Sequence, residues 1–314
     1  MSDRYPGCWP YPGSTNHHGE IEMLGDVEAT HWFVEVVRSR YHFVTAGNPG
    51  NPPVVLLHGI PETWYTFHNQ IRDLADEYYV VAVDLKGYGQ SEKRPDGEYS
   101  FPHCAFELAL LLEKLGIERF YLVGHDRGSV LADHLCNVPG RFNERIIKYA
   151  RMQQSGPKPH TEPRPPHALF ASAAGTELFL SDLFPRIVYT DLVPVPGSEG
   201  VQYVQNEIPE DVLDRLDREW KHPGAAQAVP LCFKHTNFDI EMEDRQNFLF
   251  AKMTMPVRLI QGELDPGQPP SDFEGLEALG ANFSIVWIKG AGHFQHLEKP
   301  EATTQAIRSF FAEP

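Results

Sequence analysis

Cysteine, positive charge and long apolar runs are all scarce in this chain. Its 314 residues include four cysteines that match no metal-ligand spacing, so we interpret them as free thiols in a reducing compartment: Cys8, Cys104, Cys136 and Cys232. Lysine and arginine number 27 against 43 acidic residues, which gives a formal net charge of −16. A surface of that sign repels phosphate backbones and anionic lipid, which argues against nucleic acid or a membrane as the partner.

The longest apolar runs fall well short of the roughly 20 residues that span a bilayer. The first residues, MSDRYPGCWPYPGS, also lack the basic-then-apolar pattern of a signal peptide, so we expect a cytoplasmic protein. Hydrophobic residues make up 41% of the chain, which is enough for an ordinary packed core. This length fits one large α/β domain that carries an inserted subdomain.

Residues 1–30 are rich in Pro, Gly and His without periodicity, and we interpret them as an N-terminal extension with His17 and His18 facing solvent. From residue 31 onward, short apolar segments alternate with helical patterns, which predicts a doubly wound, mostly parallel sheet. Eight strands are predicted, the first two as a hairpin, within residues 31–37, 41–47, 53–59, 78–85, 119–126, 144–152, 255–266 and 282–292. Helices are predicted near 66–77, 101–115 and 300–311.

The alternation stops in residues 155–245, which begin with the proline-rich segment SGPKPHTEPRPP and continue as broken helical stretches. Because this segment follows the sixth predicted strand, it would lie over the carboxyl ends of the strands, where such sheets bind ligands. We therefore predict a helical lid at 155–245, inserted into a core formed by residues 31–154 and 246–314.

The strongest chemical signal is the segment GHDRG at residues 124–128, between a predicted strand and a predicted helix. It has the G-x-Nuc-x-G form of a nucleophile elbow, with Asp126 at the position where Ser is more usual. The two glycines permit a strained turn that lifts one side chain into the site. Asp126 is the predicted nucleophile; the alternative is a chance strand-to-helix turn.

A base and an acid follow in the order nucleophile, acid, histidine. His293, in GAGHF after the last predicted strand, is the expected base. Asp265 follows the preceding strand and is expected to orient the imidazole, with Glu263 as the rival acid. His296 is the rival base, and we interpret it as a surface residue of the last loop.

The segment HGIP at residues 58–61 follows the third predicted strand. Its loop can present the backbone N–H of Ile60, which would form an oxyanion hole together with the N–H of Arg127. Pro61 has no N–H and can only fix the turn, and His58 is expected to be structural.

Taken together, HGIPETWYTFHNQI, DLKGYGQS, LVGHDRGS and GAGHF resemble the epoxide hydrolase and hydrolytic dehalogenase branch of the α/β-hydrolases. The resemblance covers roughly residues 30–155 and 250–314 and is weak between them. It implies the α/β-hydrolase fold, no cofactor and no metal. It also implies that Asp126 is the nucleophile, His293 the base and Asp265 the acid partner of that base.

The aspartate also has a chemical reason. A serine alkylated at a saturated carbon becomes an ether, which water does not readily cleave. An aspartate becomes an ester, whose carbonyl can be attacked by water that His293 activates. Asp126 therefore indicates a substrate opened at an sp3 carbon, such as an epoxide or an alkyl halide.

Two positions bear on the substrate class. Haloalkane dehalogenases that resemble this core usually place Trp after the nucleophile, where this chain has Arg127. Fluoroacetate dehalogenases carry Asp-Arg but have a second Arg three residues after the first; Val130 stands there, so the carboxylate clamp is incomplete. The HGIP form, in place of HGNP, also favours epoxide hydrolases. We expect a small apolar or polycyclic epoxide as the substrate.

Epoxide opening also needs an acid that protonates the leaving oxygen, and the family normally uses two lid tyrosines. The corresponding segments here are LFLSDLF, which offers Asp182 with Tyr189 nearby, and LCFKHTNF, which offers His235. Tyr203 is a further candidate, and some relatives replace one tyrosine by histidine. The alternative for Asp182 and His235 is an ordinary position on the lid surface.

Three hypotheses follow. The first is an epoxide hydrolase that yields a vicinal diol, and the second is a hydrolytic dehalogenase of haloacids or haloalkanes. The third is a ligand-binding paralogue without turnover, against which the intact nucleophile, base and oxyanion loop argue. A homodimer is possible for any of them.

Overall fold

The computed structural model describes residues 18–138, 142–154, 169–193, 199–236, 253–280 and 282–314, together with residues 241 and 250. Cys8 and His17, and parts of the predicted lid, lie outside the described residues. Cys104, Cys136 and Cys232 are buried free thiols, as predicted. Within the described chain, no helix combines the length and the apolar character needed to cross a bilayer.

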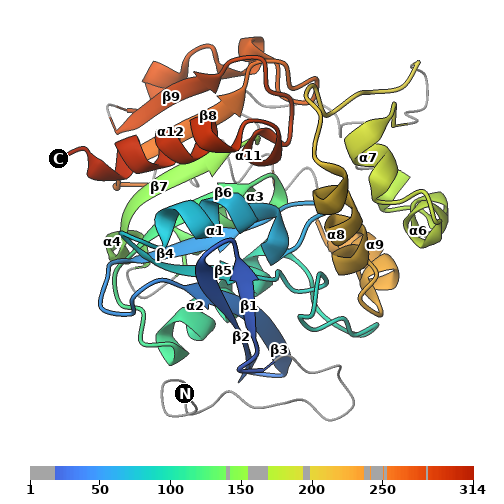
Figure 1. The fold of residues 1–314 in the computed structure, drawn as a ribbon, viewed down its shortest axis with the longest axis horizontal. Helices are drawn as coiled ribbons and strands as arrows, with labels where there is room; N and C mark the ends of the chain where they lie inside the picture. Colours follow the sequence, from blue (N-terminus) through green and yellow to red (C-terminus); the bar gives the residue numbers. More distant parts are fainter. Residues whose placement is uncertain are drawn as a thin grey trace.

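One sheet forms the centre of the structure, in the order β1-β2-β3-β5-β4-β6-β7-β8-β9 (Figure 1). The pairs β1–β2, β2–β3 and β3–β5 are antiparallel, and all the other neighbouring pairs are parallel. The predicted mostly parallel sheet is thereby confirmed. The strands are β1 (Ile21–Leu24), β2 (Val27–Val36), β3 (Ser39–Ala46), β4 (Pro53–Leu57), β5 (Tyr79–Val83), β6 (Phe120–His125), β7 (Ile146–Met152), β8 (Val257–Gly262) and β9 (Phe283–Ile288).

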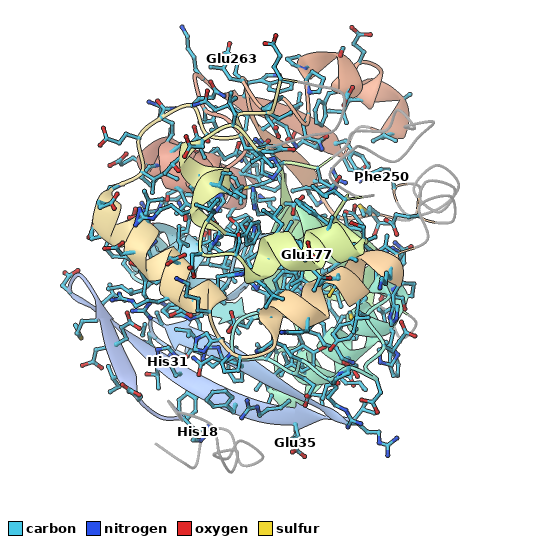
Figure 2. The ribbon with its side chains drawn as sticks, turned by 90° about the vertical axis from the view of Figure 1, so that its right-hand side faces the viewer. His18, His31, Glu35, Glu177, Phe250 and Glu263 are labelled. Carbon is cyan, nitrogen blue, oxygen red and sulfur yellow. The ribbon has the colours of Figure 1, made fainter. Side chains whose placement is uncertain are left out.

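The sheet has one strand more than the eight predicted, because β1 and the start of β2 come from the predicted N-terminal extension. The insertion consequently follows the seventh strand of the sheet instead of the sixth. The prediction that His18 faces solvent holds only in part, because this side chain is partly buried. Its ring packs edge-on against Trp32, with centroids 5.5 Å apart, and its Nδ1 accepts the N–H of Phe33 at 3.2 Å (Figure 2).

Helices cover both faces of the sheet (Figure 1). Helices α1 and α12 pack together over one face, and α2 and α3 pack together over the other. In α2 the residues Leu108, Leu111 and Leu112 are buried, as their helical spacing predicts. The core helices are η1 (Trp64–Phe67), α1 (His68–Leu74), α2 (Phe101–Lys114), α3 (Arg127–Leu135), α4 (Phe142–Arg145), η3 (Pro270–Phe273), η4 (Leu276–Leu279), α11 (Gln295–Glu298) and α12 (Pro300–Ala312).

Among the described residues between β7 and β8, four helices lie together on one side of the molecule (Figure 1): α6 (Ala173–Leu180), α7 (Arg186–Thr190), α8 (Glu210–Trp220) and α9 (Ala225–Lys234). We call this segment the insertion. Its helices pack through aromatic side chains: the Trp220 ring lies 5.6 Å from that of Phe179 and 4.7 Å from that of Phe184. In Figure 2, α6 with Glu177 faces the viewer in front of the core. Phe179, Phe184 and Trp220 belong to the same hydrophobic cluster as residues of the sheet, α2 and α3, so the insertion packs continuously on the core.

Candidate active site

Asp126 lies at a sharp turn between β6 and α3, as the elbow motif predicts. Its backbone has φ 47° and ψ −118°, a conformation that costs a non-glycine residue on the order of 1–3 kcal/mol. Close packing holds this turn, because a Cβ on Gly128 would collide with the carbonyl of Leu57 and one on Gly124 would lie 2.8 Å from Cα of Ser129. The surrounding backbone therefore enforces the strained position of the carboxylate.

The loop after β4 faces this carboxylate. The Ile60 N–H donates to Oδ2 of Asp126 at 3.1 Å. Gly59 comes so close that a Cβ there would lie 2.5 Å from that of Asp126. The N–H of Arg127 is at the first residue of α3, where backbone donors have no acceptor within the helix. His58 is buried and its Nε2 accepts the N–H of Leu85 at 3.0 Å, in keeping with a structural role.

The predicted base and acid meet beside Asp126. Nδ1 of His293 lies 2.8 Å from Oδ2 of Asp265, and Nε2 lies 3.9 Å from Oδ1 of Asp126. The other oxygen of Asp265 accepts the N–H of Gly267 at 2.7 Å, which fixes the carboxylate. Glu263, the rival acid, is exposed at the edge of the molecule and accepts the N–H of Gly290 at 3.0 Å (Figure 2). Asp265 is therefore the acid that contacts the imidazole.

The charges around His293 determine its protonation. Burial alone would lower the pKa of His293, but the charge and hydrogen bond of Asp265, followed by the charges of Asp126 and Glu62, raise it to about 9. At neutral pH the ring is therefore an imidazolium that forms ion pairs with Asp265 and Asp126.

Replacing Asp265 by asparagine is expected to lower the pKa of His293 by roughly one pH unit or more. The negative charge of Asp265 is then lost, and less charge is left to offset the effect of burial. The pKa would be measured by NMR titration of protein labelled with ¹⁵N-histidine, with His293→Gln used to assign the signal. The matched control is Glu263→Gln, which removes the charge of the rival acid and should leave the titration unchanged. The opposite pattern would make Glu263 the partner of the base.

A buried hydrogen-bond cluster lies next to the predicted catalytic residues. Glu62 accepts the N–H of Gly59 at 2.6 Å, Nδ1 of His125 at 2.7 Å, the hydroxyl of Thr66 at 2.7 Å and Nε2 of His296 at 2.9 Å. The interpretation of His296 as a surface residue is wrong, because this side chain is fully buried. Burial alone would raise the pKa of Glu62, but the two histidines hold it well below its usual range.

His125 connects this cluster to the predicted base, His293. Its Nδ1 faces the carboxylate of Glu62, and its Nε2 lies 2.9 Å from the carbonyl oxygen of His293. His125 thus joins the carboxylate of Glu62 to the backbone of the loop that carries His293. This pair links the oxyanion loop, the elbow and the base loop. The sequence analysis missed this pair, although His125 lies inside the segment GHDRG and Glu62 directly follows HGIP.

The same cluster is the part of the described chain that most resembles a metal site, since potential ligand atoms of Glu62, His125 and His296 lie within 4.8 Å of one another. The oxygens of Glu62 already accept four hydrogen bonds. The carboxylate of Glu62 is therefore satisfied without an ion, whereas Nδ1 of His296 has no hydrogen-bond partner in the described structure.

The structure brings two of the proposed ring-opening acids to the catalytic loops. The hydroxyl of Tyr189 donates to the carbonyl of Pro61 at 3.2 Å, and its ring packs edge-on against Phe294 with centroids 4.9 Å apart. The ring of Tyr203 lies 5.7 Å from that of His293, and its carbonyl accepts the His293 N–H at 2.8 Å. Both tyrosines come from the insertion.

The other two candidates are placed differently. Nδ1 of His235 accepts the backbone N–H of Tyr99 at 3.1 Å and lies 3.4 Å from Oε1 of Glu98. Its side chain is about a third exposed, at 33%. Asp182 is exposed on the turn between α6 and α7. These contacts give His235 a role in attaching α9 to the core and leave Asp182 on the surface.

Several known proteins are similar to this chain. Residues 52–185 match the family model of the alpha/beta hydrolase fold. Human epoxide hydrolase 4 is 39% identical over 297 residues, which cover 90% of this chain and 79% of the human protein. The chain belongs to the epoxide hydrolase branch of the α/β-hydrolases. It is an enzyme of that type, as predicted.

A more distant relative and a solved structure support the same fold. Epoxide hydrolase A of Mycobacterium tuberculosis (strain ATCC 25618 / H37Rv) is 29% identical, and the match covers 86% of this chain and 94% of that protein. The crystal structure of Cfl2 from Burkholderia cenocepacia superposes with a TM-score of 0.72 at 27% identity, covering 90% of this chain and 96% of the other. The α/β-hydrolase fold predicted from the sequence is thereby confirmed.

In the present chain, the side chain of Arg127 is directed to the insertion. It donates to the carbonyl of Cys232 at 3.1 Å and to Oγ1 of Thr236 at 3.3 Å, near the C-terminal end of α9, where free carbonyls attract a cation. The guanidinium carbon also lies 4.6 Å and 4.2 Å from the ring centroids of Phe101 and Phe233. Arg127 therefore attaches α9 to the nucleophile elbow.

Proposed function

We propose that this enzyme opens an epoxide to a vicinal diol through a covalent ester on Asp126. The observation that supports this best is the arrangement of Asp126, His293 and Asp265, with the His293 ring between the two carboxylates. In the first step, an oxygen of Asp126 attacks a ring carbon of the epoxide. The carbon–oxygen bond of the epoxide breaks, and the departing alkoxide takes a proton from an acid of the insertion.

In the second step, Nε2 of His293 takes a proton from water, and the resulting hydroxide adds to the ester carbonyl. The N–H of Ile60, which donates to Asp126, is placed to stabilise the oxyanion that forms. When this intermediate collapses, the bond between Cγ of Asp126 and the ester oxygen breaks, the imidazolium of His293 gives its proton to the leaving oxygen, the diol departs and the carboxylate is regenerated.

The charge changes suit this order of steps. In the free enzyme the Asp126 carboxylate contributes to the raised pKa of His293. Alkylation removes that negative charge, so the pKa of His293 falls when the ring has to act as a base. The same residue thus pairs with the nucleophile before the first step, gives up its proton to the deprotonated acid of the insertion once the ester has formed, and then takes a proton from water.

For the ring-opening acid we propose Tyr189 or Tyr203, because these two candidates contact the catalytic loops. Replacing the responsible tyrosine by phenylalanine should slow ester formation by roughly 10²–10⁴-fold, since the alkoxide loses its proton donor. Rapid-mixing measurement of the first turnover in Tyr189→Phe and Tyr203→Phe tests this. If both variants form the ester at the wild-type rate, the acid is elsewhere.

A haloacid dehalogenase is less well supported, because the guanidinium of Arg127 already binds α9 and the second arginine of the clamp is Val130. The deciding experiment is an assay of the enzyme on styrene oxide and 1,2-epoxyoctane for diol, and on chloroacetate, fluoroacetate and 1-bromobutane for halide. We expect diol from at least one epoxide. Halide release without diol formation would establish the dehalogenase instead.

A further inference from the structure

Three consecutive residues at the end of β7 contact the backbone of all three loops that carry the catalytic residues. The carbonyl of Met152 accepts the N–H of Asp126 at 3.1 Å, and the side-chain amide of Gln154 donates to the carbonyl of Asp126 at 3.4 Å. Between these two residues, Gln153 turns inward and reaches the loops of the acid and the base.

The side chain of Gln153 forms a bridge. Its Nε2 donates to the carbonyl of Gly292 at 2.6 Å, and its Oε1 accepts the N–H of Gly262 at 3.0 Å. Gly292 immediately precedes His293, and Gly262 is the last residue of β8, three positions before Asp265. One amide thus holds the backbone leading into the base and the backbone leading into its acid partner.

The position demands an amide. Gln153 is fully buried, so a side chain without both a donor and an acceptor would leave a buried backbone group unpaired, at a cost of about 1–3 kcal/mol. The two glycines also approach each other closely, because a Cβ on Gly262 would collide with the carbonyl of Gly292. No larger residue fits at Gly262, and the amide completes this contact.

The backbone of Gln153 is strained as well. Its φ is 45°, in the left-handed region that residues other than glycine seldom adopt. Strain of this kind persists where surrounding contacts enforce it, and it occurs often at active sites. At Gln153 the enforcing contacts are the two hydrogen bonds to the catalytic loops.

We propose that Gln153 is a positioning residue that fixes the distance and orientation between Asp265 and His293, and so prepares the base for ester hydrolysis. The role in hydrolysis rests on the proposed function; the effect on the Asp265–His293 pair does not. Two other backbone bonds join the same loops, from Leu264 N–H to the carbonyl of Ala291 at 2.8 Å and from Glu263 N–H to that of Ile288 at 3.1 Å. Loss of the amide should therefore shift the pair without separating the loops.

The test compares Gln153→Met with Gln261→Met. Gln261 precedes Gly262 on β8 and is as fully buried as Gln153. Neither polar atom of its side chain has a hydrogen-bond partner in the described structure. Both substitutions replace a buried amide by a thioether of similar shape, but only Gln153→Met breaks the bridge. Gln153→Asn is the second variant, because asparagine tolerates a positive φ and its amide is too short to bond both glycines.

The first readout is the NMR titration of His293, which needs no substrate. Gln153→Met and Gln153→Asn should lower the pKa of His293 by about 0.5–1, less than Asp265→Asn does, and Gln261→Met should leave it unchanged. The second readout is steady-state kinetics on an epoxide that the wild type converts. There kcat should fall about 10- to 100-fold in both Gln153 variants with little change in KM, because the base is misplaced.

An unchanged His293 titration in folded Gln153→Asn would overturn the proposal, as would equal changes in Gln261→Met. If Gln153→Met fails to fold, Gln153→Asn decides alone. A shifted titration without turnover of any epoxide by the wild type would uphold the positioning role and reject the proposed function, so the two failures are distinguishable.

Discussion

Replacing His293 by glutamine is expected to yield a protein that captures one epoxide molecule and keeps it. The Asp126 carboxylate can still attack the epoxide, so the ester forms. Water is no longer activated, so hydrolysis slows by roughly 10²–10⁴-fold and the ester accumulates. Intact-mass spectrometry after incubation with an epoxide that the wild type converts should show the protein mass increased by one epoxide, and peptide mapping should locate the addition at Asp126.

The matched control is the double variant Asp126→Ala/His293→Gln, which lacks the attacking carboxylate and should gain no mass. An adduct that persists in the double variant would place the alkylation on another residue. If His293→Gln gains no mass from any epoxide that the wild type hydrolyses, covalent catalysis is wrong and His293 serves the first step.

Replacing Asp126 by alanine is expected to reduce epoxide hydrolysis by roughly 10⁴-fold or more, because no other carboxylate takes its place at the elbow. The protein should remain folded, since the turn is held by Gly124, Gly128 and the Ser129 N–H that bonds to the Asp126 carbonyl. Turnover and thermal unfolding, measured on the same preparation, check both parts.

Asp96→Ala serves as its control, because it removes an exposed carboxylate that is paired with Arg94. This variant should keep wild-type turnover. Substantial activity in folded Asp126→Ala would mean that the elbow carboxylate is not the nucleophile.

Local signals explain why much of the core was predictable. The strand β6, the turn at Asp126 and the helix α3 follow from an apolar run and two glycines, and close backbone packing requires those glycines. His293 and Asp265 follow strands at one end of a parallel sheet, so the sequence order alone indicates that they meet. The structure brings both to Asp126.

Other features depend on contacts between distant segments and left no local signal. The strand β1 forms by pairing with β2, and its four residues alone show no strand pattern. The buried Nε2 of His296 is satisfied by a hydrogen bond to Glu62, which lies 234 positions away in the sequence. Gln153 looks like a residue after a strand until its amide is seen to bond two loops. In the insertion, the sequence pattern predicted helical stretches. It did not predict the positions of Tyr189 and His235, because these depend on contacts with the core.

A single turnover in H₂¹⁸O tests the ester on Asp126 most directly. Enzyme in excess is mixed with an epoxide that it hydrolyses, and the diol and the peptide containing Asp126 are analysed by mass spectrometry. Because water attacks the ester carbonyl, the first diol should contain only ¹⁶O, taken from the epoxide and from Asp126, and the ¹⁸O should appear in the Asp126 carboxylate. If the first diol contains ¹⁸O and the peptide none, water attacks the epoxide itself and no ester forms.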